Sequence, residues 1–160
     1  RIHGGGKNRV TFWRASNTLS QRIMGTTTGP AVAKFDLSGM QPGQQAGFVR
    51  FGGAFNLIGV EANARGQRNL FFQGNDEKQV DGPKLTGNDL YIRTTNNGSQ
   101  ASYEYSTDGK SFKRFGPEFK LVFGQWTGDR LGFFCWNEQS ETGHIDVDWF
   151  TYDYDGPKAK

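Results

Sequence analysis

The chain has 160 residues, of which 34% are hydrophobic, 14% aromatic and 22% charged, with a formal net charge of +3. This length supports one domain with a core of ordinary size. No stretch reaches the ~20 apolar residues of a membrane-spanning helix, so we expect no membrane partner. The basic residues are scattered along the chain, so we expect no nucleic-acid partner either.

The N-terminal half predicts short strands separated by turns. The first residue is Arg1 and not Met, which indicates a processed chain, a fragment or an isolated domain. Runs of alternating or apolar residues predict strands at 10–14, 17–24, 31–37, 46–51, 55–63 and 69–73. Residues 75–87 are polar and predict an exposed loop around a short edge strand.

The C-terminal half continues the same pattern. Strands are expected at 89–95, 100–107 and 110–115, with turns at Asn97-Gly98 and at Asp108-Gly109. The Asp-Gly pair is the clearest two-residue hairpin signal in the chain. Residues 119–128 form an aromatic loop that leads into the last two strands.

The stretch from 129 to 152 organises the chain. Residues 130–136 are almost wholly apolar, which predicts a strand buried on both faces. Residues 144–152 alternate, so Ile145, Val147 and Trp149 should point into the core. Asp146, Asp148 and Phe150 should then point the other way.

Ten or more short strands without helical periodicity predict an all-β fold, an antiparallel β-sandwich. Neither a repeat of fixed period nor a second domain is visible in the sequence. We therefore expect a single β-sandwich module over residues 1–155 and a disordered tail over residues 156–160.

Catalysis has little support in the sequence. His3 and His144 are the only histidines, and a structural or solvated role is favoured for His144. No serine occupies a nucleophile-elbow context, and glycoside hydrolysis needs two carboxylates across a cleft, which one sequence cannot pair. Cys135, the single cysteine, lies in an apolar strand and is expected to be a buried small hydrophobe.

Sugar binding suits the aromatic content better. Apolar C–H faces of sugar rings pack on Trp and Tyr, and their hydroxyls need polar partners. Trp126 stands in the polar loop GQWTGD, where contact with a ligand and a cap on the core edge both remain open. For Trp13 and Trp136, which lie in predicted strands, a core position is favoured. Polar contacts could come from one sheet face, although each of these residues taken singly also fits solvated surface: Arg50, Glu61, Tyr91 and Arg93.

Two carboxylates are the only hint of a metal. Asp146 and Asp148 should face the same way, and oxygen-rich surroundings suit Ca²⁺, which takes six to eight oxygen ligands. A full binding loop is missing from the pattern.

Five runs, taken in order, resemble a known family: NTLSQR at 17–22, GPAVAKFDLSGM at 29–40, QAGFVRF at 45–51, YSTDGKSF at 105–112 and GDRLGFFCWNEQSETGHIDVDWF at 128–150. They resemble the C-terminal β-sandwich of family 43 glycoside hydrolases, the β-xylosidase and arabinofuranosidase group. The resemblance implies a concanavalin A-like jelly roll that follows a five-bladed propeller, where the catalytic carboxylates lie. Related modules are classed as xylan-binding.

The resemblance therefore implies a non-catalytic accessory module whose partners are xylan or xylo-oligosaccharides and the catalytic propeller of the parent enzyme. In this family an aromatic on the loop before the penultimate strand reaches toward the active site, and the matching residue is Trp126. Asp146 matches a position linked to structural calcium in such sandwiches. The family's Trp-rich opening strands, where a calcium ligand could lie, are expected before Arg1.

Two other functions stay open. The sandwich could simply brace the propeller, or it could be a free-standing enzyme that acts on glycosides. We expect an extracellular, secreted module, with the cytoplasm as the alternative.

Overall fold

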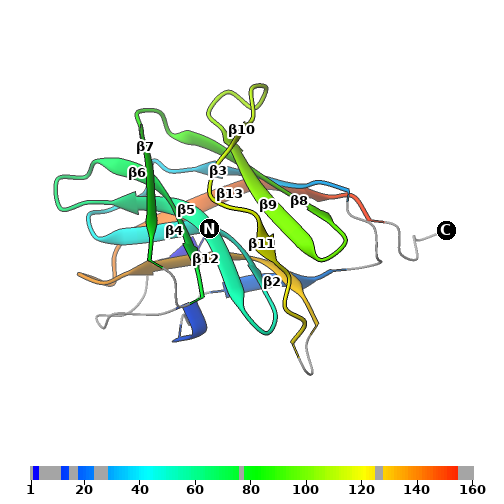
Figure 1. Cartoon of the computed structure of the whole chain (residues 1–160). Helices are drawn as coiled ribbons and strands as arrows, with labels where there is room; N and C mark the ends of the chain where they lie inside the picture. The colour runs from blue at the N-terminus through cyan, green and yellow to red at the C-terminus, as the bar shows by residue number, and fades with distance from the viewer. Residues whose placement is uncertain are drawn as a thin grey trace.

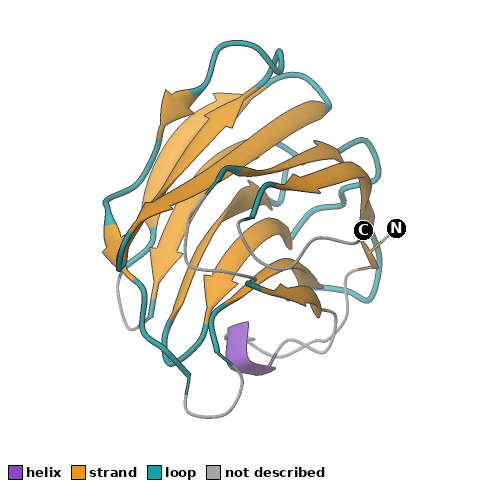
Figure 2. Ribbon diagram, turned by 90° about the vertical axis from the view of Figure 1, so that its right-hand side faces the viewer, coloured by secondary structure: helices purple, strands orange, loops and turns teal. Residues whose placement is uncertain are grey.

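The chain folds into two layers of antiparallel strands (Figures 1 and 2). A computed structural model describes residues 2–3, 12–14, 18–23, 29–75, 78–124 and 128–154. Within these residues there are thirteen strands and one short 3₁₀ turn, so the predicted all-β sandwich is confirmed. None of the described residues forms a helix long and apolar enough to cross a membrane. The tail at 156–160 lies outside the described residues.

One layer is a six-stranded sheet in the described part of the chain. Its order is β2-β12-β4-β5-β6-β7. The strands are β2 (Thr18–Arg22), β12 (Arg130–Asn137), β4 (Gln44–Phe51), β5 (Phe55–Ala62), β6 (Arg68–Gly74) and β7 (Val80–Leu85). The edge strand β7 lies within the polar segment where a short edge strand was predicted.

The other layer has seven described strands in the order β1-β13-β3-β8-β9-β10, with β11 also paired to β9. The strands are β1 (Ile2–His3), β13 (His144–Tyr152), β3 (Ala31–Asp36), β8 (Asp89–Asn97), β9 (Gln100–Ser106), β10 (Lys113–Arg114) and β11 (Phe119–Lys120). The last two long strands, β12 and β13, therefore belong to different sheets, and residues 138–143 cross from one layer to the other.

Aromatic rings fill the space between the two sheets. Phe48 on β4 lies 5.5 Å from Phe133 and 6.2 Å from Phe150, measured between ring centroids. Phe35 on β3 meets Phe133 edge-on at 5.6 Å. Because these rings come from both sheets, they hold the layers together, and edge-to-face contacts add to the burial of apolar area.

A second apolar cluster covers the outer face of the six-stranded sheet. The 3₁₀ turn η1 (Phe12–Arg14) lies at one end of the strands (Figure 2), and Phe12 packs against Phe51 and Phe55. The same cluster includes Phe134 and Trp136 of β12. This cover explains why β12 is buried on both faces, as predicted. Trp136 is buried as expected, but Trp13 is 50% exposed, and residues 12–14 form a turn where a strand was predicted.

The prediction that Trp149 points into the core is wrong. The partner of Val147 is Phe35 and the partner of Trp149 is Lys34, so Asp148 is an extra residue in a β-bulge. Such a bulge reverses the alternation beyond it. Phe150 packs against the core instead, and Trp149 is 42% exposed on the outer face.

The Asp108-Gly109 turn is longer than the two residues predicted, because β10 begins only at Lys113. The Asp108 carboxylate accepts hydrogen bonds from the backbone N–H groups of Lys110 and Ser111, both at 2.8 Å, and from the Ser106 hydroxyl at 2.7 Å. These local bonds hold residues 107–112 in a compact loop that competes with a tight hairpin. The turn at Asn97-Gly98 forms as predicted, with Gly98 at φ 59°.

Cys135 should not react with thiol reagents in the native protein. Its side chain is buried, its sulfur accepts a hydrogen bond from the Gln44 amide at 2.9 Å, and burial raises the pKa of the thiol to about 11. Because the thiolate is the reactive form, we expect negligible labelling by a disulfide reagent at pH 8 and one equivalent of labelling after denaturation. Rapid stoichiometric labelling of the folded chain would contradict this burial.

Asp108 should make stability depend on acid pH. The backbone N–H of Ser111 and the Ser106 hydroxyl, which bind its charged form, hold the pKa of this carboxyl well below its usual range. A depressed folded-state pKa stabilises the fold above the unfolded-state pKa of about 4, and this stabilisation is lost as pH falls further. Asp108→Asn should therefore melt below the wild type at pH 7, with a difference that narrows toward pH 3. Melting curves that stay parallel over this range would refute the assignment.

Candidate functional site

The connection between β11 and β12 lies at one end of the sandwich (Figure 1, bottom). We call residues 121–129 the 121–129 loop, and it corresponds to the aromatic loop predicted from the sequence. Phe123 is 76% exposed and Val122 is 44% exposed. Trp126 and its two neighbours lie outside the described residues, so the structure does not place the predicted stacking residue.

Backbone hydrogen bonds anchor the first half of this loop. Leu121 donates its N–H to the carbonyl of Ser99 at 2.7 Å, and Val122 accepts from the N–H of Gly53 at 2.6 Å. The contact with the β4–β5 turn is close, because a Cβ added at Gly52 would lie 2.5 Å from the Val122 oxygen. Glycine at this position therefore allows the loop to rest on the turn.

Arg50 anchors the other end of the loop. Its side chain is 3% exposed and lies in the space between the sheets. It is ion-paired at 3.2 Å with Asp129, at the end of the loop, and donates to the amide oxygen of Asn96 on β8 at 2.9 Å. Burial raises the pKa of Asp129, and the nearby guanidinium partly offsets that effect. Arg50 thus ties the loop to both sheets.

An exposed tryptophan lies near the base of the loop. Trp13 contacts Phe51 and Phe55, which flank the β4–β5 turn, with ring centroids 6.4 and 5.7 Å away. Its indole N–H donates to the side chain of Asn75 at 3.1 Å. Trp13 and Phe123 therefore both lie near the β4–β5 turn and present apolar surface, which is suited to stacking on sugar rings or to packing against another domain.

The four residues proposed for polar contacts do not share one sheet face, so that expectation is wrong. Arg50 lies between the sheets. Glu61 is on the outer face of the six-stranded sheet, where it accepts hydrogen bonds from Gln45 and Gln79, both at 3.1 Å. Tyr91 and Arg93 are on β8, which belongs to the other sheet.

Tyr91 and Arg93 face away from the core, because the inward positions of β8 are taken by its buried residues Leu90, Ile92 and Thr94. Arg93 forms an ion pair at 2.6 Å with Glu104, and its guanidinium lies 4.1 Å from the centre of the Phe112 ring. Their ligand-binding role is a prediction that the structure leaves open.

Asp146 and Asp148, the predicted calcium ligands, each lie beside a basic side chain in the described structure. Asp148 pairs with Lys34 at 2.7 Å, and Asp146 lies 4.0 Å from the His144 ring nitrogen. Within the described residues, no cluster of three or more acidic, His or Cys side chains could hold a metal ion. Ca²⁺ needs six to eight oxygen ligands, which these two residues do not assemble. A structural calcium ion at Asp146 and Asp148, with further ligands from outside the described residues, stays a prediction.

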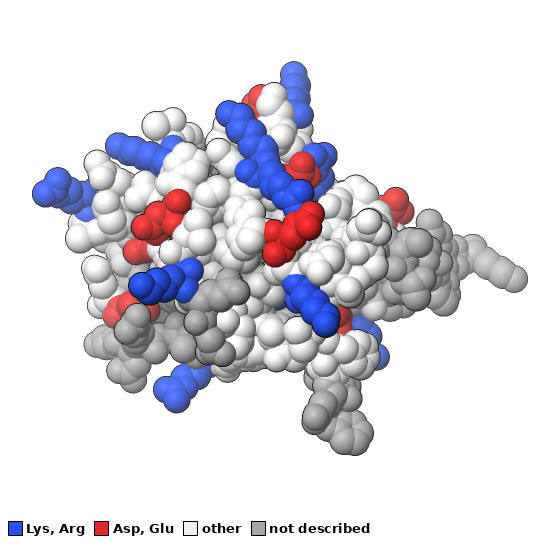
Figure 3. All heavy atoms as spheres, in the orientation of Figure 1, with Lys and Arg blue, Asp and Glu red and all other residues white. Residues whose placement is uncertain are grey.

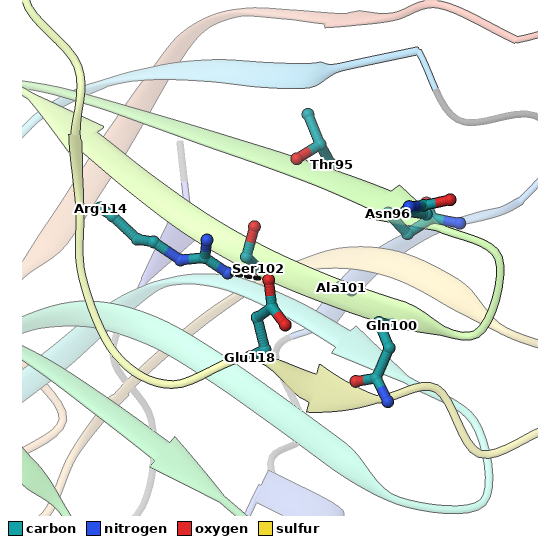
Figure 4. A pocket seen from close by; sticks show the side chains of 8 residues that line it. Thr95, Asn96, Gln100, Ala101, Ser102, Arg114 and Glu118 are labelled. Carbon is teal, nitrogen blue, oxygen red and sulfur yellow. Dashed lines mark hydrogen bonds and ion pairs between the residues drawn. The ribbon is translucent and has the colours of Figure 1, made fainter.

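A polar cavity of about 350 Å³ lies along β9 (Figure 4). Arg114 and Glu118 form an ion pair at 2.6 Å on one side of it. The lining residues are Thr95, Asn96, Asn97, Gln100, Ala101, Ser102, Arg114 and Glu118. None of them is aromatic, so this cavity lacks the stacking surface that was predicted for a sugar site.

Two exposed aromatic residues were missed as candidates from the sequence. Phe123 had a signal, because it stands three residues before Trp126 in the same predicted loop. The sequence carried no such signal for Trp149. Strict alternation along residues 144–152 assigned this side chain to the core, and the alternating pattern does not reveal the bulge.

Charged residues are interspersed on the face seen in Figure 3, where basic and acidic side chains lie close to one another. That face offers no broad surface of one sign for a highly charged partner.

Known proteins with similar sequence or structure include a β-xylosidase and several family 43 glycoside hydrolases. The chain is 66% identical over 148 residues to a β-xylosidase of Formosa agariphila, covering 92% of this chain and 25% of that protein. The chain thus spans about a quarter of the length of this curated relative.

Solved structures that share the fold include two family 43 enzymes. One is an engineered family 43 glycoside hydrolase described as having both endo-xylanase and exo-arabinofuranosidase activity. It has a TM-score of 0.82 and 22% identity, covering 92% of this chain and 33% of that one. The other is a bifunctional family 43 enzyme of Bacteroides eggerthii, with a TM-score of 0.82 and 24% identity, covering 92% of this chain and 20% of that one.

The resemblance seen in the sequence is confirmed along nearly the whole chain. Residues 1–153 match the family described as the β-xylosidase C-terminal concanavalin A-like domain, and this chain belongs to that family.

Proposed function

We propose that this module is a non-catalytic accessory domain of a xylan-degrading family 43 glycoside hydrolase, and that its 121–129 loop completes the sugar pocket of the catalytic propeller. The observation that carries the proposal is Phe123, which is 76% exposed on a loop anchored by hydrogen bonds to two neighbouring turns. Xylan or xylo-oligosaccharides are the sugars that the family membership favours.

Anchoring matters because a mobile aromatic would lose conformational freedom when it met a ligand. Here the backbone before Phe123 is already held by Ser99 and Gly53, and the end of the loop is held through Asp129 by Arg50. Such preorganisation lowers the ordering cost of binding. Trp126, three residues further on, would add the larger stacking surface that the resemblance implies.

A non-catalytic role is supported by the ion pairs that three of the described carboxylates form. Asp129 is paired with Arg50 and Glu104 with Arg93. Glu118 faces the polar cavity along β9, where it pairs with Arg114. Hydrolysis of a glycoside needs one carboxyl group as an acid and another as a base or nucleophile. Release of reducing sugar by the purified chain, with contaminating hydrolases excluded, would support the alternative of a free-standing enzyme.

Two further roles, binding of xylan by the module itself and simple bracing of the propeller, can be separated experimentally. A module that binds xylan would be retarded in a gel that contains the polysaccharide, whereas a module that only braces the propeller would not. Attachment to a polysaccharide would raise the local concentration of the enzyme on its substrate.

Phe123→Ala should impair the complete enzyme that carries this module. Loss of one stacking aromatic should lower kcat/KM for xylo-oligosaccharides about five- to tenfold, because such contacts are worth about 1 kcal/mol beyond their buried area. Trp126→Ala should have an effect of at least this size. The matched control is Leu19→Ala, which removes a 65% exposed apolar side chain from β2. Turnover that is unchanged in both loop variants would reject the proposal.

Arg50→Met should destabilise the module, because it leaves Asp129 partly buried without its ion-pair partner. Breaking a buried pair in this way costs about 3–5 kcal/mol in the free energy of unfolding, measurable by urea denaturation. Arg114→Met, which breaks an exposed ion pair, is the control and should cost less than about 1 kcal/mol. If the two substitutions lowered the free energy of unfolding equally, Arg50 would not be bracing the loop.

A further inference from the structure

A pair of aromatic rings lies on the outer face of the seven-stranded sheet, at the bulge in β13. Trp149 and Tyr91 have ring centroids 6.1 Å apart and planes inclined by 54°. Lys34 of β3 lies between their strands, since it pairs with Trp149 on one side and with Tyr91 on the other. The two rings therefore reach toward each other across the central strand.

The bulge is what exposes the tryptophan. In a regular strand, Trp149 would point inward as the alternation predicts. The extra residue Asp148 turns Trp149 outward while Phe150 still packs against the core. β-Bulges often re-aim a side chain beside a functional site, and an exposed tryptophan gives up the favourable free energy of burial. The arrangement therefore indicates that Trp149 serves something other than the core.

Hydrogen-bonding groups surround the aromatic pair. Asp148 and Lys34 are ion-paired at 2.7 Å next to Trp149. Arg93 lies two residues along β8 from Tyr91, roughly 6.6 Å away on the same face, and is paired with Glu104. A ligand stacked on the two rings would thus have charged hydrogen-bond donors and acceptors beside it. These charged side chains already form ion pairs with one another, so their charges are neutralised.

This chemistry favours a neutral polyhydroxylated ligand. An acidic or basic partner would have to compete with the internal ion pairs of Lys34 and Arg93. A stable protein interface buries about 800 Å² on each partner, whereas the apolar part of this surface is essentially two rings. A sugar unit needs only an aromatic face for its C–H groups and a few polar atoms for its hydroxyls.

We propose that Trp149 and Tyr91 form a carbohydrate-binding surface on the outer face of the seven-stranded sheet, which holds a neutral polysaccharide chain such as xylan. Arg93 and Asp148 supply hydrogen bonds at its edge. This surface is separate from the 121–129 loop. This proposal depends on the proposed carbohydrate role of the module, but it does not require that the 121–129 loop completes the catalytic pocket.

The test is affinity electrophoresis of the 160-residue chain in native gels that contain soluble arabinoxylan, with dextran gels as the reference. The wild type should be retarded by arabinoxylan, and Trp149→Ala should bind about tenfold more weakly, because it loses a stacking ring. Trp149→Tyr, which keeps a flat ring, should retain most of the retardation. Thermal melts of each variant check that the fold is intact, which the exposed position of Trp149 favours.

A control variant separates this surface from exposed apolar surface in general. Leu19→Ala should be retarded like the wild type, and the role of the 121–129 loop is tested separately, by turnover of the complete enzyme. The inference is overturned if the wild type is not retarded, or if Trp149→Ala is retarded as strongly as the wild type. It is also overturned if Trp149→Ala leaves retardation intact and instead lowers the melting temperature of the complete enzyme, because that result would identify a contact between domains.

Discussion

The packing of aromatic rings between the two sheets is the interaction on which the other features depend. Phe48 on the six-stranded sheet contacts Phe150 and Tyr103 on the seven-stranded sheet, with centroids 6.2 and 6.3 Å apart. Removing one such ring costs about 3–5 kcal/mol, a large part of the roughly 5–15 kcal/mol by which a domain is stable. Because this contact sets how the layers face each other, it also decides where Arg50 can reach β8 and where the outer faces present their side chains. The anchored loop and the bulge both depend on a pair of sheets that does not shift.

Much of this core could be predicted from the sequence, because strand periodicity is a local property. The alternating apolar residues at 31–37 predicted a strand, and Ala31, Ala33 and Phe35 of that strand are all buried. The apolar run of β12 predicted burial on both sides, and the structure gives the reason. One face meets the other sheet, and the second face belongs to a cluster that includes Phe12 from a distant part of the chain. The sequence therefore showed that both faces of β12 are buried, but it did not show which residues cover each face.

The candidate site was harder to predict, because sheet membership is set by long-range pairing. Glu61 and Tyr91 both alternate with apolar neighbours, so each could be assigned to an outward face, but the sequence does not say that β5 and β8 belong to opposite layers. Local side-chain bonds also change the backbone, as Asp108 does when it replaces a tight hairpin with a longer loop. The bulge at Asp148 is a similar case, since one inserted residue barely changes the composition of the strand but reverses the facing of the later side chains.

The exposed aromatic residues are placed by irregular backbone. Trp13, Phe123 and Trp149 are the large aromatic side chains that the described residues leave exposed, and they lie in a 3₁₀ turn, a loop and a bulge. An aromatic on a regular strand is partly covered by its neighbours, as Tyr91 is by Gly109. A break in the strand pattern frees a ring without taking one from the core, because Phe150 packs inward beside the exposed Trp149. A loop at one end and a bulge on one face can therefore serve different ligands, and each can change without altering the packing that holds the sheets together.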